Sequence, residues 1–410
     1  MSEEKKIMAI TGGRLIDGTG ADPVENATVI IEGLTIKEVG KGLNVPRSAT
    51  VLDIAGKTVM PGLINAHLHL AGGSNPTGPS PYRPREVSMF QSAKDAQNCL
   101  ASGITTVKDC AGRNAPFLKQ AVREGVLTGL PRIVAACCAL TRTGGPLDGM
   151  PGGGSRDARV NNEAEALVCD GVDECIKATR YSMRLGADFI KVFASLNFFH
   201  PGATTLAGVV FTLEELETIV KTAGKVGKYV SVHSQNRVSS KDCVLAGIKT
   251  IDHGSRSDEE IVTLGKERGT IFTSTLAYLR VMLDARPPGA AAMIEEEWDR
   301  SVESYTMMHD MGAVVAAGTD SFGDAGECAL EIELLNKYCN FTPMEAIVAS
   351  TKRGAEACFI GDNTGTVEAG KLADIIVVDG DPLADVKILQ DVDKIKIVML
   401  EGNVCIDRGL

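Results

Sequence analysis

Six side chains that bind metals or move protons stand at the ends of short apolar segments: His67, His69, Lys191, His233, His253 and Asp320. An α/β barrel places its catalytic groups at the carboxyl ends of its strands, so residues from separate segments could meet there in one site. Histidine and carboxylate ligands around a divalent cation activate water for hydrolysis. The pattern therefore predicts a metal-dependent hydrolase.

His67 and His69 provide the first pair of ligands. They lie two residues apart at the end of the apolar segment 59–66, and alternate residues of a strand face the same side. Two imidazoles on one rigid strand can chelate a metal ion. A buried strand ending in two histidines without partners would leave polar rings unsatisfied, which favours the chelate over an ordinary solvated pair.

Asp320 and Lys191 are charged residues within apolar segments, at 313–321 and 188–195. Burying a lone charge is costly unless a metal ion or an opposite charge balances it. A metal ion or a cation would balance Asp320. An ion pair or a side chain that reaches solvent is the ordinary explanation for an isolated lysine, so Lys191 taken alone leaves both interpretations open.

The segments around these residues alternate between strand and helix. Eight strand candidates follow from the apolar and β-branched runs, at 62–69, 103–110, 131–140, 188–195, 228–235, 250–254, 270–276 and 313–321. Amphipathic helices fit between them, for example one that begins at Thr212 with Glu215 three residues later, the spacing of a capping box. Eight strands alternating with helices predict an α/β fold, a distorted (β/α)8 TIM barrel.

The two chain ends have a different pattern. Short β-branched runs separated by glycine turns lie at 7–15, 27–32, 35–39 and 50–54, and again at 373–379 and 396–400. We expect both ends to form a small composite β-sandwich domain, residues 1–60 and 359–410, around a barrel of residues 61–358. Three long segments, 71–85, 141–160 and 278–290, follow predicted strands and are expected to cover the catalytic face as irregular loops.

Composition restricts the partners. The formal net charge is −11 and no Lys/Arg run is long enough for a phosphate-binding stripe, so we expect a small-molecule substrate and no nucleic acid. No segment reaches the roughly 18 apolar residues that cross a bilayer, and the first residues lack a signal sequence, which predicts a cytoplasmic protein without a membrane segment. The number of cysteines is odd, and Cys110, Cys137, Cys138 and Cys358 lie in apolar runs, which predicts buried thiols. We also expect a homo-oligomer.

Taken together, the residues and their order resemble the amidohydrolase superfamily. The similar motifs span nearly the whole chain: MPGLINAHLH at 60–69, GITTVKD at 103–109, GADFIK at 186–191, IDHG at 251–254, AGTD at 317–320 and GKLAD at 370–374. The chain looks most like the prolidase-like branch. That branch includes dipeptidases that cleave Xaa-Pro or Xaa-Arg/Lys, and relatives that hydrolyse amides of N-acylated amino acids.

The resemblance implies a binuclear metal site, with zinc as the expected metal. The inner ion would be held by His67, His69 and Asp320 and the outer ion by His233 and His253, with a carboxylated Lys191 bridging them. Carboxylation would turn a stranded cation into an anion beside two metals. A hydroxide shared by the metals would attack an amide or peptide C–N bond, and Asp320 would take the water's proton and deliver it to the leaving nitrogen. The implied substrate is a dipeptide such as Xaa-Pro or an N-acyl amino acid.

Three departures from the family pattern bear on the substrate. Asn236 stands where deaminating members tend to carry a glutamate, which disfavours deamination. Pro146 and Leu147 follow a glycine pair where the prolidase-like branch has a histidine shortly afterwards, and Gln235 stands where a histidine is frequent. A lactonase, a cyclic amide hydrolase and a mononuclear deaminase remain alternatives. A non-catalytic scaffold is a further one, although it would be expected to lack ligands.

Four residues are candidates for substrate binding. Arg142, Arg237 and Tyr278 lie just beyond predicted strands and could grip a carboxylate. His200, together with the neighbouring phenylalanine pair 198–199, could form an apolar wall above the metals or could pack the loop. Asp109 also ends a predicted strand, and we expect it to tie loops by hydrogen bonds and to take no part in catalysis.

Overall fold

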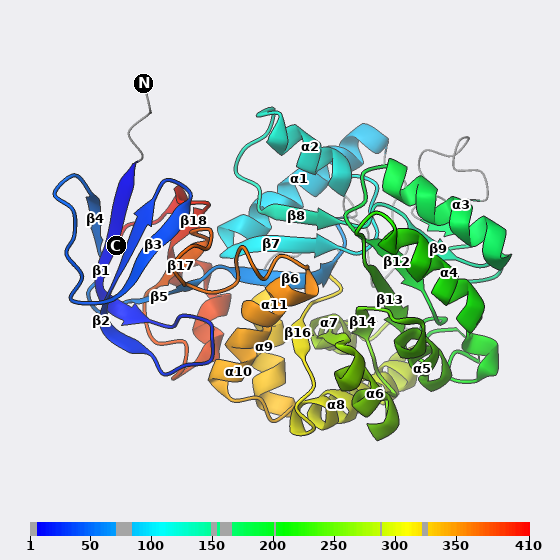
Figure 1. The fold of residues 1–410 in the computed structure, drawn as a ribbon. Coiled ribbons are helices and arrows are strands. Elements are labelled where there is room, and N and C mark those ends of the chain that lie inside the picture. The colour runs from blue at the N-terminus through cyan, green and yellow to red at the C-terminus, as the bar shows by residue number, and fades with distance from the viewer. Residues whose placement is uncertain are drawn as a thin grey trace.

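The computed structural model describes residues 6–70, 84–148, 154–155, 166–200, 202–287, 289–321 and 327–410. Strands from both chain ends share one sheet, in the order β19-β18-β17-β5-β1-β2-β3, with β4 paired to β1. These strands are β1 (Ile7–Leu15), β2 (Val24–Glu32), β3 (Thr35–Lys41), β4 (Thr50–Asp53), β5 (Thr58–Pro61), β17 (Ile375–Val378), β18 (Ile395–Leu400) and β19 (Asn403–Asp407). In Figure 1 the first strands (blue) and the last strands (red) lie side by side.

The pairing of β5 with β17 joins the two ends of the chain. The two strands are antiparallel, with Pro61 opposite Ile375 and Val59 opposite Val377. Val59, Ile375 and Val377 are buried in one apolar cluster that also contains Ile397 of β18. Since apolar side chains from both ends remove each other's surface from water, neither end buries its apolar face without the other.

The rest of the chain forms two parallel sheets. One has the order β6-β7-β8 and the other β10-β11-β9-β12-β13-β14-β15-β16. Their strands are β6 (Leu63–Leu68), β7 (Ile104–Asp109), β8 (Arg132–Ala135), β9 (Ala139–Thr141), β10 (Gly154–Ser155), β11 (Ala166–Val168), β12 (Ile190–Phe193), β13 (Val230–Ser234), β14 (Thr250–His253), β15 (Ile271–Ser274) and β16 (Val315–Ala317). Parallel neighbours need crossover connections, which here are mostly helices.

Hydrogen bonds connect the three-stranded sheet to the larger sheet at both edges of the smaller one, β6 and β8. Leu68, at the end of β6, forms a parallel bridge with Ser321 beyond β16, and the His69 N–H donates to the Ser321 carbonyl at 2.9 Å. At the other edge, the Asp188 N–H, just before β12, donates to the carbonyl of Ala135 in β8 at 2.7 Å. The carboxyl ends of β6, β12, β13, β14 and β16 therefore face a common region.

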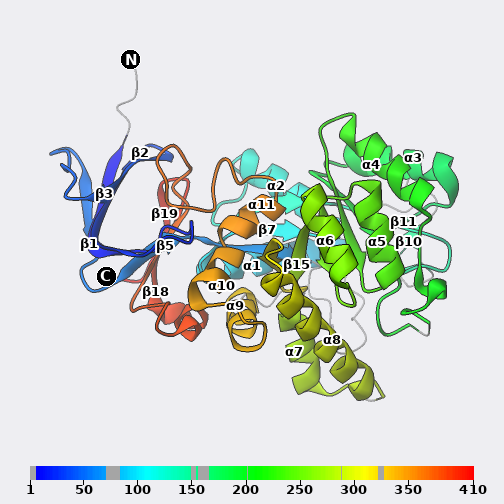
Figure 2. The same ribbon diagram turned by 60° about the horizontal axis from the view of Figure 1, so that its bottom comes forward.

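Helices cover the outside of these sheets. They are α1 (Arg85–Ala101), α2 (Ala115–Arg123), α3 (Gly171–Arg184), α4 (Leu213–Gly224), α5 (Arg237–Ala246), α6 (Glu259–Arg268), α7 (Leu276–Ala285), α8 (Ala291–Asp310), α9 (Glu327–Tyr338), α10 (Pro343–Ala349) and α11 (Lys352–Ala357), with short 3₁₀ turns η1 (Leu206–Gly208), η2 (Val386–Gln390) and η3 (Val392–Lys394). The predicted capping box of α4 is confirmed: Thr212 Oγ1 accepts from the Glu215 N–H, and Glu215 Oε2 accepts from the Thr212 N–H. Figure 2 shows α7 and α8 projecting together from the body of the protein.

Two predicted elements differ from the structure. The expected strand 131–140 is split into β8 and β9, because Cys137 between them has a left-handed backbone with φ 67°. The expected strand 270–276 ends at Ser274, and α7 occupies much of the expected loop 278–290. The first N–H groups of α7, on Leu276 and Ala277, donate to the carboxylate of Glu331 in α9, so a distant residue caps this helix. Segments 71–83, 149–153 and 156–165 lie outside the described residues.

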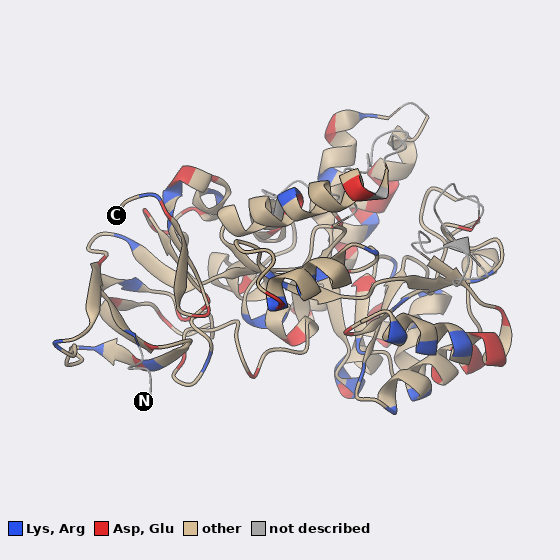
Figure 3. Cartoon of the chain, turned by 90° about the horizontal axis from the view of Figure 1, so that it is seen from above, with Lys and Arg blue, Asp and Glu red and all other residues tan. Residues whose placement is uncertain are grey.

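Charged and apolar residues are clearly separated in the fold. Lys, Arg, Asp and Glu are mixed along the outer helices (Figure 3), and the four cysteines of the apolar runs are buried as predicted. Among the helices that the structure describes, none is long and apolar enough to cross a membrane. A small set of charged side chains is nevertheless buried, among them Lys108, Lys191 and Asp252. These three side chains lie close together, since Asp252 contacts Lys191 and lies 3.9 Å from Lys108.

Candidate metal centre

Strand β6 and the end of β16 bring three predicted ligands together. The N–H groups of Thr319 and Asp320 donate to the His67 carbonyl at 2.8 and 2.9 Å. His67 Nε2 lies 3.3 Å from Asp320 Oδ1, and His69 Nε2 lies 3.0 Å from the same oxygen. Gly318 permits this approach, because a Cβ at that position would lie 2.6 Å from the Cβ of His67.

The ring of His69 requires a positive charge between itself and Asp320. Its Nδ1 lies 3.1 Å from the Ala111 carbonyl oxygen, which can only accept, so Nδ1 carries a proton. In the neutral ring, Nε2 is then an acceptor that faces an acceptor oxygen of Asp320 at 3.0 Å. A proton or a metal ion between the two atoms removes this conflict, and imidazole with carboxylate is a common ligand combination for divalent metals.

The electrostatics of His67 and Asp320 agree with this requirement. Burial lowers the pKa of His67, but Cys110 and Asp252 help to raise it well above its ordinary value. Burial raises the pKa of Asp320, but hydrogen bonds with His67 and His69 hold it well below its ordinary value. An ionised carboxylate therefore faces the His67 ring, whose surroundings favour positive charge, and a metal cation can supply that charge.

The neighbouring strands β13 and β14 carry His233 and His253. Their ring centroids are 4.5 Å apart, and those of His253 and His67 are 5.1 Å apart. Burial lowers the pKa of His253 to about 3 and the pKa of His233 well below its ordinary value, so both rings are neutral, the form that binds metals. His253 Nδ1 pairs with Thr275 Oγ1 at 2.8 Å, which leaves Nε2 for a ligand. His233 Nε2 is buried and has no hydrogen-bond partner in the described part of the chain.

Backbone geometry also singles out two of these ligands. His253 and Asp320 have φ values of 69° and 57°, in the left-handed region that most residues avoid. Such conformations cost on the order of 1–3 kcal/mol and gather at functional sites, where the surrounding structure enforces them. At Asp320 the hydrogen bond of its N–H to the His67 carbonyl helps to fix this geometry.

Lys191 is buried on β12 and its Nζ contacts the carboxylate of Asp252. Asp252 also accepts a hydrogen bond from Ser231 Oγ at 2.9 Å and lies 3.9 Å from Lys108 Nζ. Burial raises the pKa of Asp252, but Lys191 and Lys108 bring it well below its ordinary value. His67 Nδ1 lies 3.2 Å from the same carboxylate, at ion-pair distance though not aligned as a hydrogen bond. Asp252 thus balances the positive charges of Lys191 and Lys108 beneath the predicted ligands.

The residues present fit a divalent metal ion. Ligand atoms of His67, His253 and Asp320 all lie within 4.8 Å of one another. The Nε2 of His233, which has no hydrogen-bond partner among the described residues, and the facing atoms of His69 and Asp320 would be satisfied by the same kind of ion. Nitrogen and oxygen donors of this type suit zinc and similar first-row metals.

All six predicted ligands open into one cavity of about 230 Å³. Tyr278 and His200, two of the predicted substrate-binding residues, line it. Burial raises the pKa of the Tyr278 hydroxyl, which keeps it a hydrogen-bond donor. The other walls come from β12, from the connections that follow β7, β9, β12, β13 and β15, and from α7 and α8, with the residues Ala111, Pro146, Leu147, Phe193, Asn197, Phe198, Phe199, Gln235, Thr275, Leu279 and Ser301.

The structure does not bring the two predicted arginines to this cavity. Arg237 begins α5 and its guanidinium pairs with Asp258 and with Glu260 on the exposed outer side. Arg142 is directed to backbone carbonyls, donating to Thr143 at 2.7 Å and to Ala207 at 3.5 Å. Sequence position beyond a strand was therefore an insufficient criterion, because the following residue can turn to the outside of the sheet.

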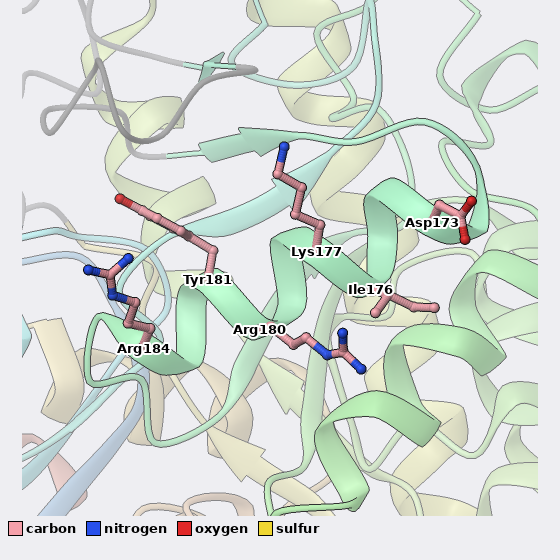
Figure 4. A pocket seen from close by; sticks show the side chains of 6 residues that line it. All are labelled: Asp173, Ile176, Lys177, Arg180, Tyr181 and Arg184. Atoms are coloured by element: carbon pink, nitrogen blue, oxygen red, sulfur yellow. The ribbon is translucent and has the colours of Figure 1, made fainter.

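A second hollow lies on the outer face of α3. Its lining residues all belong to that helix, and Figure 4 shows Lys177 and Arg180 extending to different sides of it. No group of polar side chains converges there among the described residues. The hollow therefore differs from the histidine-lined cavity, where groups from five strands meet.

Comparison with known proteins shows which family the chain belongs to. The family model of the amidohydrolase family matches residues 58–405. The chain belongs to the amidohydrolase family. The ochratoxinase of Aspergillus niger is 28% identical over 100% of this chain and 88% of its own length. Its crystal structure superposes with a TM-score of 0.90 at 26% identity, covering 99% of this chain and 97% of the other.

Two further amidohydrolase relatives are similar over nearly the whole chain. A prolidase crystallised with N-methylphosphonate-L-proline has a TM-score of 0.85 at 27% identity, covering 97% of this chain and 99% of the other. The imidazolonepropionase of Thermoplasma volcanium is 22% identical over 94% of this chain and 92% of its own length. The resemblance noted in the sequence motifs is thus confirmed at the level of the family.

Sequence reasoning missed several residues of this amidohydrolase site. Lys108 and Asp252 lie beneath the ligands, Thr275 positions His253, and Phe193 packs its ring against His233 with 5.4 Å between centroids. Lys108 gave the same signal as Lys191, a lysine in an apolar strand. Thr275 and Phe193 gave none, because their roles depend on contacts between strands.

Proposed function

We propose that this amidohydrolase uses two divalent metal ions, with zinc as the expected metal, to hydrolyse the amide or peptide bond of a dipeptide such as Xaa-Pro or of an N-acyl amino acid. The observation that carries the proposal is the convergence of four histidines, Lys191 and Asp320 on one cavity. The ochratoxinase and prolidase relatives support hydrolysis of an amide or peptide bond.

Each ligand has a role in the proposed centre. The inner ion would be held by His67, His69 and Asp320, the outer ion by His233 and His253, and a carboxylated Lys191 would bridge them. When bound, two such ions lower the pKa of a shared water and polarise the scissile carbonyl. The contact of Lys191 Nζ with Asp252 would orient the N–H of the carboxylated side chain.

Asp320 is the proposed proton carrier. Its carboxylate is ionised, and its Oδ1 lies next to two imidazoles at the floor of the cavity. Its carboxylate would accept the proton of the attacking water and return it to the leaving nitrogen. The neutral His233 and His253 do not compete for that proton, because burial lowers the pKa of both rings.

The architecture proposed around this site is a distorted (β/α)8 barrel, residues 61–358, closed between β16 and β6. The bridge from Leu68 to Ser321 and the hydrogen bonds to the His67 carbonyl support closure. The two chain ends, 1–60 and 359–410, would form a small β-sandwich domain, as their shared sheet supports.

Asn236 bears on the deaminase alternative. Its Oδ1 accepts from the N–H groups of Val238 and Ser239 at the start of α5, and its Nδ2 donates to the carbonyls of Ala203 and Thr205. Both ends of this amide are therefore occupied by backbone groups. A neutral capping residue supports amide hydrolysis over deamination, which needs an acid–base group.

The test is amino-acid release by zinc-loaded protein from dipeptides and N-acyl amino acids with a varied C-terminal residue. We expect release from at least one class, and Asp320→Asn should lower turnover by orders of magnitude while the protein retains much of its metal. Metal content measured by mass spectrometry should approach two ions per chain. Silence across the panel, or near-normal turnover in the Asp320→Asn variant, would contradict the proposal.

A further inference from the structure

The cavity above the ligands has an aromatic wall. The Phe193 ring lies against the His233 ring, with centroids 5.4 Å apart, and the Phe198 and Phe199 rings are 4.0 Å apart at an angle of 35°. All three phenylalanines line the cavity. Tyr278 of α7 lines it too, so aromatic surface comes from two separate parts of the chain.

Hydrogen bonds hold this wall in place. The backbone N–H of Phe198 donates to Gln235 Oε1 at 3.0 Å, and the Gln235 N–H donates to Ser195 Oγ at 2.9 Å. Asn197 Oδ1 accepts from the Phe199 N–H at 3.2 Å and pairs with His200 Nδ1 at 2.7 Å. Gln235 is nearly buried and directly follows β13, so the strand that carries His233 also anchors the wall.

The polar groups around this wall carry little charge. Among the described lining residues, Lys191 is the one lysine or arginine and Asp320 the one acid, and both are proposed metal ligands. Away from the proposed metal ligands, the other polar side chains of the lining are amides and hydroxyls, such as Gln235, Thr275 and Ser301, together with the imidazole of His200 at the exposed rim. A cavity of about 230 Å³ with apolar walls and neutral donors suits a small, flat apolar group.

We propose that the substrate carries an aromatic ring, or a comparably flat apolar group, next to the scissile bond, and that Phe193, Phe198, Phe199 and Tyr278 bind it. The ring contact between Phe193 and His233 places this wall immediately beside the proposed metal ligands. Stacked and edge-to-face contacts between rings favour an aromatic substituent beyond its buried area. The inference rests on the proposed function and names its substrate class.

The test compares substrates that differ only in the ring. One pair is N-benzoylglycine and N-acetylglycine, with the ring on the acyl side. The other is N-acetylphenylalanine and N-acetylalanine, with the ring on the amine side. We expect kcat/KM of the zinc-loaded protein to be about 10-fold higher or more for the aromatic member of at least one pair. Ratios below about 2-fold in both pairs would overturn the proposal.

Binding measurements distinguish a failure of this inference from a failure of the proposed function. Dissociation constants of the same four compounds are measured by calorimetry on the zinc-loaded Asp320→Asn variant, in which slow turnover does not disturb the titration. Tighter binding of an aromatic member, with no hydrolysis by the unaltered protein, would retain the ring site and reject the amidohydrolase activity. Equal binding within both pairs would reject the ring site whether or not hydrolysis occurs.

Two variants and a control locate the wall. Phe198→Ala should reduce the aromatic-to-aliphatic ratio roughly 3- to 10-fold, the effect of one ring contact. Gln235→Leu removes the acceptor for the Phe198 N–H and should reduce the ratio in the same direction. Phe90→Ala changes an exposed phenylalanine on α1, outside the cavity lining, and should leave the ratio unchanged. A ratio that falls equally in all three variants, or in none, would overturn the assignment of the wall.

Discussion

Replacing Lys108 by methionine should destabilise the metal-free protein strongly, although Lys108 is not a predicted metal ligand. Its side chain is fully buried, and its Nζ donates to Ser231 Oγ and Thr250 Oγ1, both at 3.1 Å. The same nitrogen lies 3.9 Å from the buried carboxylate of Asp252 and 4.9 Å from the centroid of the Phe189 ring. Methionine has a similar shape but supplies neither the charge nor the donors.

The expected loss in the free energy of unfolding follows from the charge of Asp252, which stays buried after the substitution. Breaking a buried ion pair by removing one partner costs about 3–5 kcal/mol, because the other charge stays buried. Asp252 keeps one cation in contact, Lys191, so we expect a loss near the lower limit, about 3 kcal/mol. Removing both charges in Lys108→Met with Asp252→Asn should cost less than the sum of the single changes, with a coupling of about 1–3 kcal/mol.

Urea unfolding of the metal-free variants, followed by circular dichroism, measures these free energies. Lys119→Met is the matched control, because Lys119 pairs with Asp188 while its side chain is 43% exposed. An exposed pair of this kind contributes about 0–1 kcal/mol. A Lys108→Met variant that loses no more stability than Lys119→Met, or single changes that add without coupling, would refute the argument from buried charge.

Three other changes test the site and its support. Lys191→Ala should lower the metal content to one ion or none per chain, whereas two tightly held ions would exclude the bridging role. Gly318→Ala pushes a methyl group toward the Cβ of His67 and should weaken metal retention by one to two orders of magnitude in dialysis measurements. Burial raises the pKa of Glu331 from 4.5 to about 7, so the folded state binds the proton of this carboxyl group more tightly than the unfolded state does. The stability that this proton contributes is fully present below pH 4.5 and is lost as the pH rises through 7. Glu331→Gln should therefore gain stability relative to the unaltered protein by about 3 kcal/mol between roughly pH 4 and pH 8 in urea titrations, and a difference independent of pH would contradict this pKa shift.

The positions of most strands of the parallel sheets could be predicted from the sequence because each is a short apolar run, whereas β10 and β11 lie in none of the predicted segments. Each of the eight predicted segments contains at least one strand of the parallel sheets. The break at Cys137 and the early end of β15 could not be predicted in this way. Apolar residues continue through both places, while a left-handed φ at Cys137 and a carboxylate of Glu331, 55 residues from Leu276, determine where the strands stop.

The predicted ligands meet in one cavity because each lies on a strand or just beyond its end, and the strand itself determines where that residue lies. Lys108 and Asp252 were available to the same reasoning, since both are charged residues in apolar strands, but their pairing crosses from β7 to β14 and leaves no local pattern. The two arginines were selected because they lie just beyond predicted strands, but their side chains do not line the cavity. Arg237 follows a strand, yet acidic partners at Asp258 and Glu260 hold its guanidinium on the outside.

Different interactions therefore determine the positions of the metal ligands and of the cavity walls. A ligand such as His233 is placed by its own strand, whereas the Phe198 wall is placed by a hydrogen bond to Gln235, 37 residues further along the chain. A substitution at Gln235 is therefore expected to move the wall without moving His233, because β13 fixes the backbone of His233, while Gln235 lies just beyond the strand and its side chain reaches the loop. On this basis substrate preference can diverge while the metal ligands stay in place, and the wall is where the specificity of this amidohydrolase should be sought.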